Sequence, residues 1–183
     1  DARQVRMEIP ELFWQKAVGE EASILLLAQL QDNEDVDITN FEFNSKDLRI
    51  KGRATIEPEN GKLLEAYLSN VLLGDNDVNV KYRRDADNNI LLDVGGKSLD
   101  LRPYIKQLLD SEQGNLPSFI LVTNVDRLIT RADQQITNVR ARVINTAERL
   151  ESAFLTGTLV TGSEIRLVLE PNGAKRRLVV RSD

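Results

Sequence analysis

The chain of 183 residues contains no cysteine and no histidine. The absence of cysteine excludes disulfide bonds and thiol catalysis, and the two absences together exclude zinc fingers built from these ligands. Without imidazole the chain also lacks the side chain that most often acts as a base or metal ligand near neutral pH. Composition alone therefore excludes several large classes of enzyme and metal site.

Long hydrophobic runs and aromatic residues are also scarce, and the 24 Lys and Arg are outnumbered by 29 Asp and Glu. The longest unbroken apolar run is Ile24–Ala28, whereas a membrane-spanning helix needs roughly 20 residues. With aromatic residues at 5%, a core must consist mainly of Leu, Ile and Val, and the net charge of -5 gives little general attraction for nucleic acid. The chain begins at Asp1 without a signal-peptide pattern, so we expect it to be an excised piece of a longer protein or a processed product.

What the chain does contain is alternation of apolar and polar residues with a period of two. The pattern is clearest in Leu48–Ile56, Val139–Ile144, Glu164–Glu170 and Lys175–Arg181. Strict alternation places one face of a strand on a core and the other in water, as in half-buried antiparallel strands. The sequence therefore predicts a mainly β protein.

Turn signals separate these segments. Pro58–Gly61 and Pro171–Gly173 both contain Asn-Gly, which supplies positive φ at low cost in a hairpin. Asp87–Asn89, Gly95–Gly96 and Thr161–Ser163 are further predicted turns. Their spacing favours a meander of strands over alternating strands and helices.

Three segments carry helical features. Leu101–Ser111 has Pro103 in its first turn and apolar residues at helical spacing, so it predicts a short helix near residues 102–111. Gly19–Leu30 and Lys62–Leu73 are rich in Leu and Ala and fit either a helix or a strand. The Gly and Pro after the predicted helix suggest two β units, residues 1–113 and 118–183, with a net acidic first part and a slightly basic second part.

Motifs that would indicate chemistry are weak. The pairs Asp35/Asp37, Asp75/Asp77 and Asp85/Asp87 are better explained as turn residues than as an acid/base pair or calcium site, and Gly95–Ser98 lacks the first glycine of a phosphate loop. Arginines on alternate positions, such as Arg140 and Arg142, fit a solvated strand face better than a phosphate site. We expect no enzyme activity, no catalytic residue, no metal and no cofactor.

A resemblance to a known family rests on two phrases. Gly96–Pro103 reads Gly-Lys-Ser-Leu-Asp-Leu-Arg-Pro, and Asp126–Leu128 reads Asp-Arg-Leu. Together with the segment that starts at Ile9, the two Asn-Gly hairpins and the strand rhythm between them, they resemble the AsmA-like family of large periplasmic, inner-membrane-anchored proteins of Gram-negative bacteria. In that family the first phrase closes one β unit and the second opens the next.

The resemblance implies a fold, a location and a function. The chain would be an internal fragment in which both Leu-rich segments are strands of a long twisted antiparallel sheet, curled into a groove. The parent would lie in the periplasm, tethered to the inner membrane by a segment outside this chain. The function implied is a lipid-binding bridge that takes part in phospholipid transport between the inner and outer membranes and in outer-membrane integrity, with phospholipid acyl chains as ligands and no nucleic acid partner.

Apolar residues on the predicted strand faces are the candidates for contact with lipid. They are Ile50, Ala54, Ile56, Phe119, Leu121, Val125, Val139, Ala141, Val143, Phe154, Ile165, Leu167 and Leu169. Two alternatives stay open. One is a β-rich structural or protein-interaction module with a closed core, and the other is an enzyme that uses carboxylates alone.

Overall fold

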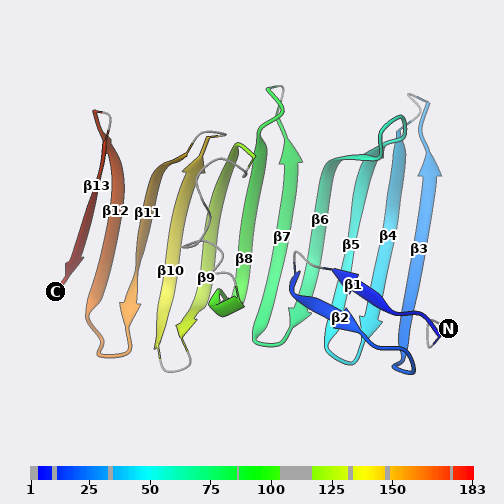
Figure 1. The fold of residues 1–183 in the computed structure, drawn as a ribbon, viewed down its shortest axis with the longest axis horizontal. Helices are drawn as coiled ribbons and strands as arrows, with labels where there is room; N and C mark the ends of the chain where they lie inside the picture. Colours follow the sequence, from blue (N-terminus) through cyan, green and yellow to red (C-terminus); the bar gives the residue numbers. More distant parts are fainter. Residues whose placement is uncertain are drawn as a thin grey trace. The chain divides into compact units, whose positions relative to one another are not determined.

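The computed structural model is almost entirely β (Figure 1). Two short strands, β1 (Met7–Ile9) and β2 (Trp14–Lys16), form an antiparallel pair of their own, and the other eleven strands form one sheet. The structure describes residues 4–9, 12–32, 35–85, 87–103, 117–131, 134–146, 149–173 and 175–183.

Hydrogen-bonded neighbours in the large sheet follow the order of the chain from β3 to β13. The sheet is open, and β3 and β13 are its edge strands. The strands are β3 (Ala22–Leu30), β4 (Val36–Ser45), β5 (Leu48–Glu57), β6 (Lys62–Leu73), β7 (Asn76–Arg84), β8 (Ile90–Asp100), β9 (Phe119–Arg131), β10 (Gln134–Asn145), β11 (Leu150–Leu159), β12 (Glu164–Asn172) and β13 (Lys175–Ser182).

The prediction of a mainly β fold with a long open sheet is confirmed. Both Leu-rich segments are strands, β3 and β6, because a neighbouring strand pairs with each and overrides the local preference for helix. The turns at Gly61, Asn88, Gly162 and Gly173 have positive φ, as their sequences predicted. The predicted turn at Gly95–Gly96 is wrong, since both glycines lie inside β8.

One connection departs from the predicted antiparallel meander. Strands β8 and β9 run parallel, from the pair Ile90 and Phe119 to the pair Asp100 and Ile129, so the sheet is mixed. Parallel neighbours need a crossover of about a dozen residues or more, and residues 101–118 provide that length. Arg102 and Pro103 are helical, and the rest of the predicted helix, residues 104–111, lies outside the described residues.

The chain divides into two compact units, residues 1–80 and 81–183, with the division inside β7. In unit 1, strands β3 to β6 form an antiparallel meander. In unit 2, β9 to β13 are antiparallel neighbours and β8 adds in parallel. The predicted boundary between the two β units, at residues 113–118, falls mostly on residues outside the described part. The two predicted β units therefore stay a prediction.

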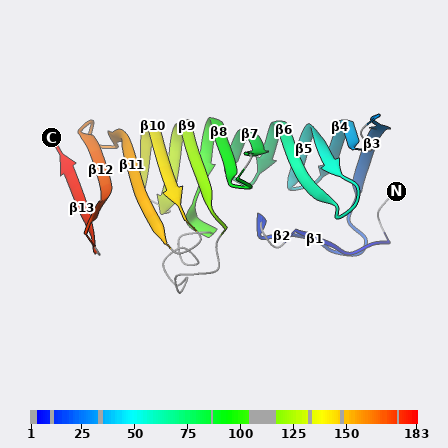
Figure 2. The same cartoon turned by 90° about the horizontal axis from the view of Figure 1, so that it is seen from above.

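The hairpin of β1 and β2 forms a second layer over one end of the unit-1 sheet (Figures 1 and 2). The indole of Trp14 packs edge-on against Phe43 of β4, with ring centroids 5.2 Å apart. Both side chains are buried, as is that of Lys16, whose ammonium donates to the carbonyls of Val5 and Ala17 at 2.8 and 3.0 Å. The hairpin therefore covers this end of the sheet with an aromatic contact, and backbone carbonyls accept hydrogen bonds from the buried Lys16 side chain.

The single tryptophan makes docking of the hairpin measurable, because Trp14 is the only indole in the chain. Phe43→Ala removes the ring against which it packs, so we expect a red shift of Trp14 emission, easier quenching by acrylamide and a loss of about 3–5 kcal/mol in the free energy of unfolding. Phe43→Leu should produce a smaller shift.

The matched control is Phe154→Ala, since Phe154 is 37% exposed and lies in unit 2. That variant should leave the emission of Trp14 unchanged. Unchanged emission in folded Phe43→Ala would show that the hairpin does not dock as described.

Candidate functional site

In unit 1, register gives the sheet one face that is almost wholly apolar. Ile24 of β3 pairs with Phe43 of β4, which pairs with Ile50 of β5, which pairs with Val71 of β6, and paired residues share a face. We call this surface the unit-1 apolar face. Its members are Ala22, Ile24, Leu26, Ala28, Leu30, Val36, Ile38, Phe41, Phe43, Leu48, Ile50, Gly52, Ala54, Ile56, Leu63, Ala66, Leu68, Val71 and Leu73.

The hairpin covers this face at one end only. The covered end contains Ala22, Phe43, Leu48, Ile50 and Val71, which are all buried. Toward the other end the side chains on β4, β5 and β6 are half-buried, and on the edge strand β3 Ile24 and Leu26 each keep 50% of their accessible surface. A stretch of apolar sheet surface therefore stays in contact with water.

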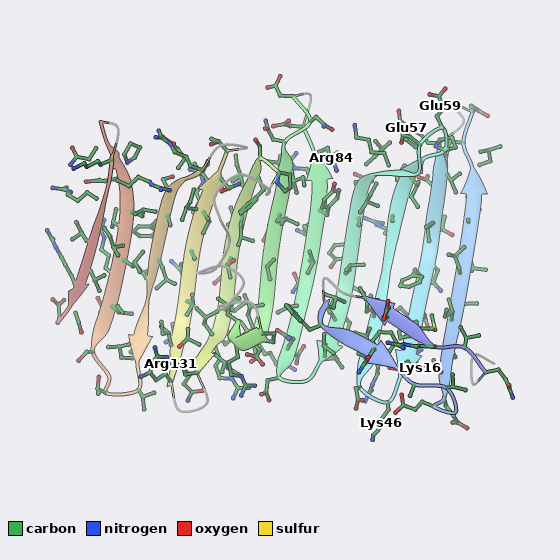
Figure 3. The ribbon with its side chains drawn as sticks, in the orientation of Figure 1. Lys16, Lys46, Glu57, Glu59, Arg84 and Arg131 are labelled. Atoms are coloured by element: carbon green, nitrogen blue, oxygen red, sulfur yellow. The ribbon has the colours of Figure 1, made fainter. Side chains whose placement is uncertain are left out.

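The opposite face of unit 1 is polar. Glu42 and Lys51 are register partners on it and form an ion pair at 2.7 Å, which lowers the pKa of Glu42. Thr55 donates to Asp37 at 2.8 Å on the same strands. Charged residues also mark the strand ends of this unit, with Glu57 and Glu59 at one end and Lys46 at the other (Figure 3). This face is therefore largely solvated through its charged residues, although Leu25 and Leu27 of β3 are exposed on it as well.

Unit 2 also has one largely apolar face, and its other face is mixed. Leu121 of β9 pairs with Val143 of β10, which pairs with Ala153 of β11, which pairs with Leu169 of β12, which pairs with Leu178 of β13. We call the surface that they share the unit-2 apolar face. Its members are Ile90, Leu92, Val94, Gly96, Phe119, Leu121, Thr123, Val125, Val139, Ala141, Val143, Ala153, Leu155, Gly157, Ile165, Leu167, Leu169, Leu178 and Val180.

All but one of the predicted lipid-contact residues lie on these two faces. In unit 1, Ile50 lies under the hairpin, whereas Ala54 and Ile56 lie beyond the buried group and are half-buried. Nine more lie together on the unit-2 apolar face: Phe119, Leu121, Val125, Val139, Ala141, Val143, Ile165, Leu167 and Leu169.

Phe154 is the exception, because it lies on the opposite face of unit 2. Its register partners are Arg142 and Val168, and the guanidinium of Arg166 lies 5.4 Å from the centre of its ring. The neighbouring residue Leu155, which the sequence did not single out, occupies the apolar face instead. The segment Ser152–Leu155 does not alternate between polar and apolar residues. Its sequence alone therefore does not decide which of its residues lie on the apolar face, and pairing of β11 with β10 and β12 decides it.

Some residues of the unit-2 apolar face are fully buried, and others are accessible to solvent. Val125 and Val139 are register partners with 2% and 0% exposure, and Thr123 is buried beside them. Gly157 allows this close packing, since a Cβ there would lie 2.5 Å from Ile136 Cγ2 and 3.3 Å from Val139 Cγ2. Leu121, Ala141, Val143, Leu167 and Leu169 are half-buried, and at the edge Leu178 and Val180 are more than half exposed.

Two exposed residues of the unit-1 apolar face, Ile24 and Leu26, were not predicted. Ile24 and Leu26 belong to a run of five apolar residues in which Leu25 and Leu27 fill the positions that are usually polar. The sequence of β3 therefore shows no alternation of apolar and polar residues. Only pairing with Phe43 and Phe41 of β4 shows that Ile24 and Leu26 lie on the apolar face. The signal that could have found these residues is the strong alternation in β5, extended across the sheet by register.

The carboxylate pairs have structural roles where the structure describes them. Asp85 accepts backbone hydrogen bonds from Asp87 and Asn89, and the side-chain amide of Asn89 is the main cause of its lowered pKa. Among the described residues, no three His, Cys, Asp or Glu side chains lie close enough to hold a metal ion. In the same part of the chain, no helix is long and apolar enough to cross a membrane.

The two sequence phrases of the family resemblance lie side by side. In the parallel pair of β8 and β9, Ser98 is in register with Arg127, and the Arg127 Nε donates to Ser98 Oγ at 3.2 Å. One residue beyond β8, the Leu101 amide donates to the carbonyl of Ile129 at 2.9 Å. The phrases thus form one structural junction, where β8 ends and the crossover begins.

Asp100 and Arg102 close this junction. The Arg102 guanidinium donates to both carboxylate oxygens of Asp100, from Nε at 2.9 Å and from Nη2 at 2.7 Å, and its backbone N–H donates at 2.9 Å. The guanidinium hydrogen bond is the main cause of a lowered pKa at Asp100, and burial of the carboxylate acts in the opposite direction. Folding therefore favours the charged form of Asp100.

A lowered pKa makes this contribution to stability depend on pH. It is fully present above the unfolded value of about 3.9 and is lost as the pH falls through the lower folded value. We expect Asp100→Asn to reduce the free energy of unfolding by about 1.5–3 kcal/mol at pH 7 and to flatten its loss on acidification below about pH 4. Urea unfolding at several pH values measures both effects.

Asp93→Asn is the control, because Asp93 is an exposed carboxylate on the same strand. Asp93→Asn should have the same free energy of unfolding, and the same dependence of that free energy on pH, as the unaltered chain. If Asp100→Asn and Asp93→Asn gave the same stability and the same pH profile, the Asp100–Arg102 pair would not hold the junction.

Comparison of the chain with protein-family models, curated proteins and solved structures found no match. The functional assignment therefore depends on the two apolar faces and on the junction between β8 and β9.

Proposed function

We propose that this chain is a segment of a periplasmic lipid-binding bridge of the AsmA-like kind, which holds phospholipid acyl chains during transport between the inner and outer membranes. The observation that carries the proposal is the incomplete cover of the unit-1 apolar face. Its hairpin buries one end of the face, the side chains toward the other end are only half-buried, and on the edge strand β3 Ile24 and Leu26 keep half of their accessible surface. An uncovered apolar surface of this kind needs an apolar occupant.

An acyl chain fits the chemistry of these faces. Their side chains are mainly aliphatic, and burying a methylene group contributes about 0.8 kcal/mol without requiring a specific partner. A surface that makes many weak contacts with an acyl chain allows the acyl chain to slide along it, whereas a tight binding site would retain the acyl chain. Leu121, Val143 and Leu169 are half-buried, so each keeps part of its surface available for such contact.

The family resemblance gains support from the junction. Its two phrases were recognised by sequence alone, and the register places Ser98 beside Arg127 and ends β8 in the Asp100–Arg102 pair. Residues that are distant in sequence but form one hydrogen-bonded structure have a shared physical reason to occur together. In the proposed function this junction maintains the sheet and does not contact lipid.

Photo-crosslinking in cells tests the proposal at neighbouring positions on opposite faces. Ala141 and Val143 lie on the unit-2 apolar face, and Arg140 and Arg142 alternate with them on the other face. With a photoreactive residue placed at each position in turn, we expect phospholipid adducts at 141 and 143, and several times fewer at 140 and 142. Mass spectrometry of the adducts identifies the lipid.

Each alternative gives a different result. Equal labelling of the two faces, or no lipid adduct at any position, would contradict the conduit. Protein adducts confined to 141 and 143 would instead favour an interaction module whose apolar face is closed by a partner protein.

A further inference from the structure

The face of unit 2 opposite its apolar face gathers arginines from the two strands that flank β11. Arg140 and Arg142 lie on β10, and Arg166 lies on β12. Thr156 of β11 is the register partner of both Arg140 and Arg166, and paired residues share a face. Arg142 lies two residues from Arg140 and therefore points to the same face. All three arginines are exposed, so register brings three positive charges together on one surface.

The surroundings of these arginines do not neutralise them. Asp126 of β9 and Glu164 of β12 share this face, but no described carboxylate forms an ion pair with any of the three. Arg166 instead faces Thr156 on one side and Arg181 on the other, and like charges opposite each other are unfavourable. Several other cross-strand pairs of charged residues in the sheet have opposite signs: Glu42 with Lys51, Glu57 with Lys62, and Glu170 with Arg177. A bound anion would relieve the repulsion at Arg166.

An apolar row lies directly beside the arginines on the same face. Phe154 pairs with Val168 on one side and with Arg142 on the other, and Arg142 pairs in turn with Val122. Phe154 and Val122 are exposed by 37% and 42%. The guanidinium of Arg166 lies over the ring of Phe154, 5.4 Å from its centre, and a stacked guanidinium keeps its N–H donors at its edge, where an anion can meet them.

We propose that this surface binds an acidic segment of a partner protein, with carboxylates on the guanidiniums and an apolar side chain against Phe154. We call it the arginine patch, and its members are Val122, Arg140, Arg142, Phe154, Arg166 and Val168. The planar fork of Arg accepts a carboxylate through two parallel hydrogen bonds. The patch lies on the face opposite the proposed lipid contacts, so both surfaces can be occupied at once.

The composition of the patch favours a protein over an anionic membrane. Arg beside an exposed aromatic ring is typical of protein interfaces, whereas Lys attracts an anionic lipid surface as well as Arg does, and the patch contains no Lys. Val122 and Val168 have shorter side chains than the arginines beside them. A layer of lipid headgroups would therefore meet the guanidiniums first, whereas a single side chain of a polypeptide can reach the valines.

Fluorescence anisotropy of a labelled synthetic peptide that repeats Glu-Glu-Phe tests the patch in the whole chain. We expect binding that weakens with added salt, because the contacts are between charges. Replacing Arg140→Gln and Arg166→Gln together should weaken binding about tenfold or more, since two charge-assisted contacts are lost. Phe154→Ala should also weaken it, and a peptide that repeats Gln-Gln-Phe should not bind measurably.

The matched control is Arg149→Gln with Arg177→Gln, which removes the same charge from two arginines that already pair with Glu151 and Glu170. This variant should bind the acidic peptide within about twofold of the unaltered chain, apart from the general charge effect that salt screens. The proposal is overturned if the acidic peptide does not bind, if the two double variants weaken binding equally, or if Arg140 and Arg166 are needed for binding to phosphatidylglycerol vesicles but not to the peptide.

Discussion

The alternation of apolar and polar residues along strands constrains everything else in this protein. Once β4, β5 and β6 pair in register, their alternate side chains must gather on one face, and that face must leave water. The same condition holds in unit 2, where β9 to β12 place Leu121, Val143, Ala153 and Leu169 side by side. An open sheet cannot cover its own apolar face, so the cover has to come from another layer or from a ligand.

The hairpin of β1 and β2 shows what protein cover looks like here. Where Trp14 meets Phe43, the exposure of the apolar face falls to a few per cent, whereas on the edge strand β3 Ile24 and Leu26 keep about half of their accessible surface. This contrast lies within one unit and one sheet, so it does not arise from a difference in composition. It makes the uncovered part of the unit-1 apolar face the most informative surface of the molecule.

Much of the fold could be predicted, because period-two alternation and Asn-Gly turns are local signals. Leu48–Ile56 and the turns at Gly61 and Gly173 needed no knowledge of their neighbours. The parallel pair of β8 and β9 could not be predicted in this way, since the direction of a strand relative to its neighbour is decided by the crossover and not by the strand's own residues.

The candidate site shows the same limit. Residues in strictly alternating strands, such as Ala141 and Val143, share one face as predicted, whereas Phe154 lies on the other face and the sequence analysis assigned no face to the β3 residues. In Ser152–Leu155 and Ile24–Leu27 consecutive residues are apolar, so alternation does not show which of them lie on the apolar face. Pairing with the neighbouring strand determines it. Exposure was also beyond sequence reasoning, because Val125 and Val139 have the same pattern as Leu121 and Val143 but are sealed.

The account depends on lipid contact being a property of one face, and two adjacent leucines test that most directly. Leu25 and Leu26 have nearly equal exposure, 48% and 50%, but lie on opposite faces of β3. Transfer of a fluorescent phospholipid from vesicles to the protein should be strongly reduced by Leu26→Glu and kept by Leu25→Glu, with both variants folded. Equal transfer by the two variants, whether high or low, would contradict the account.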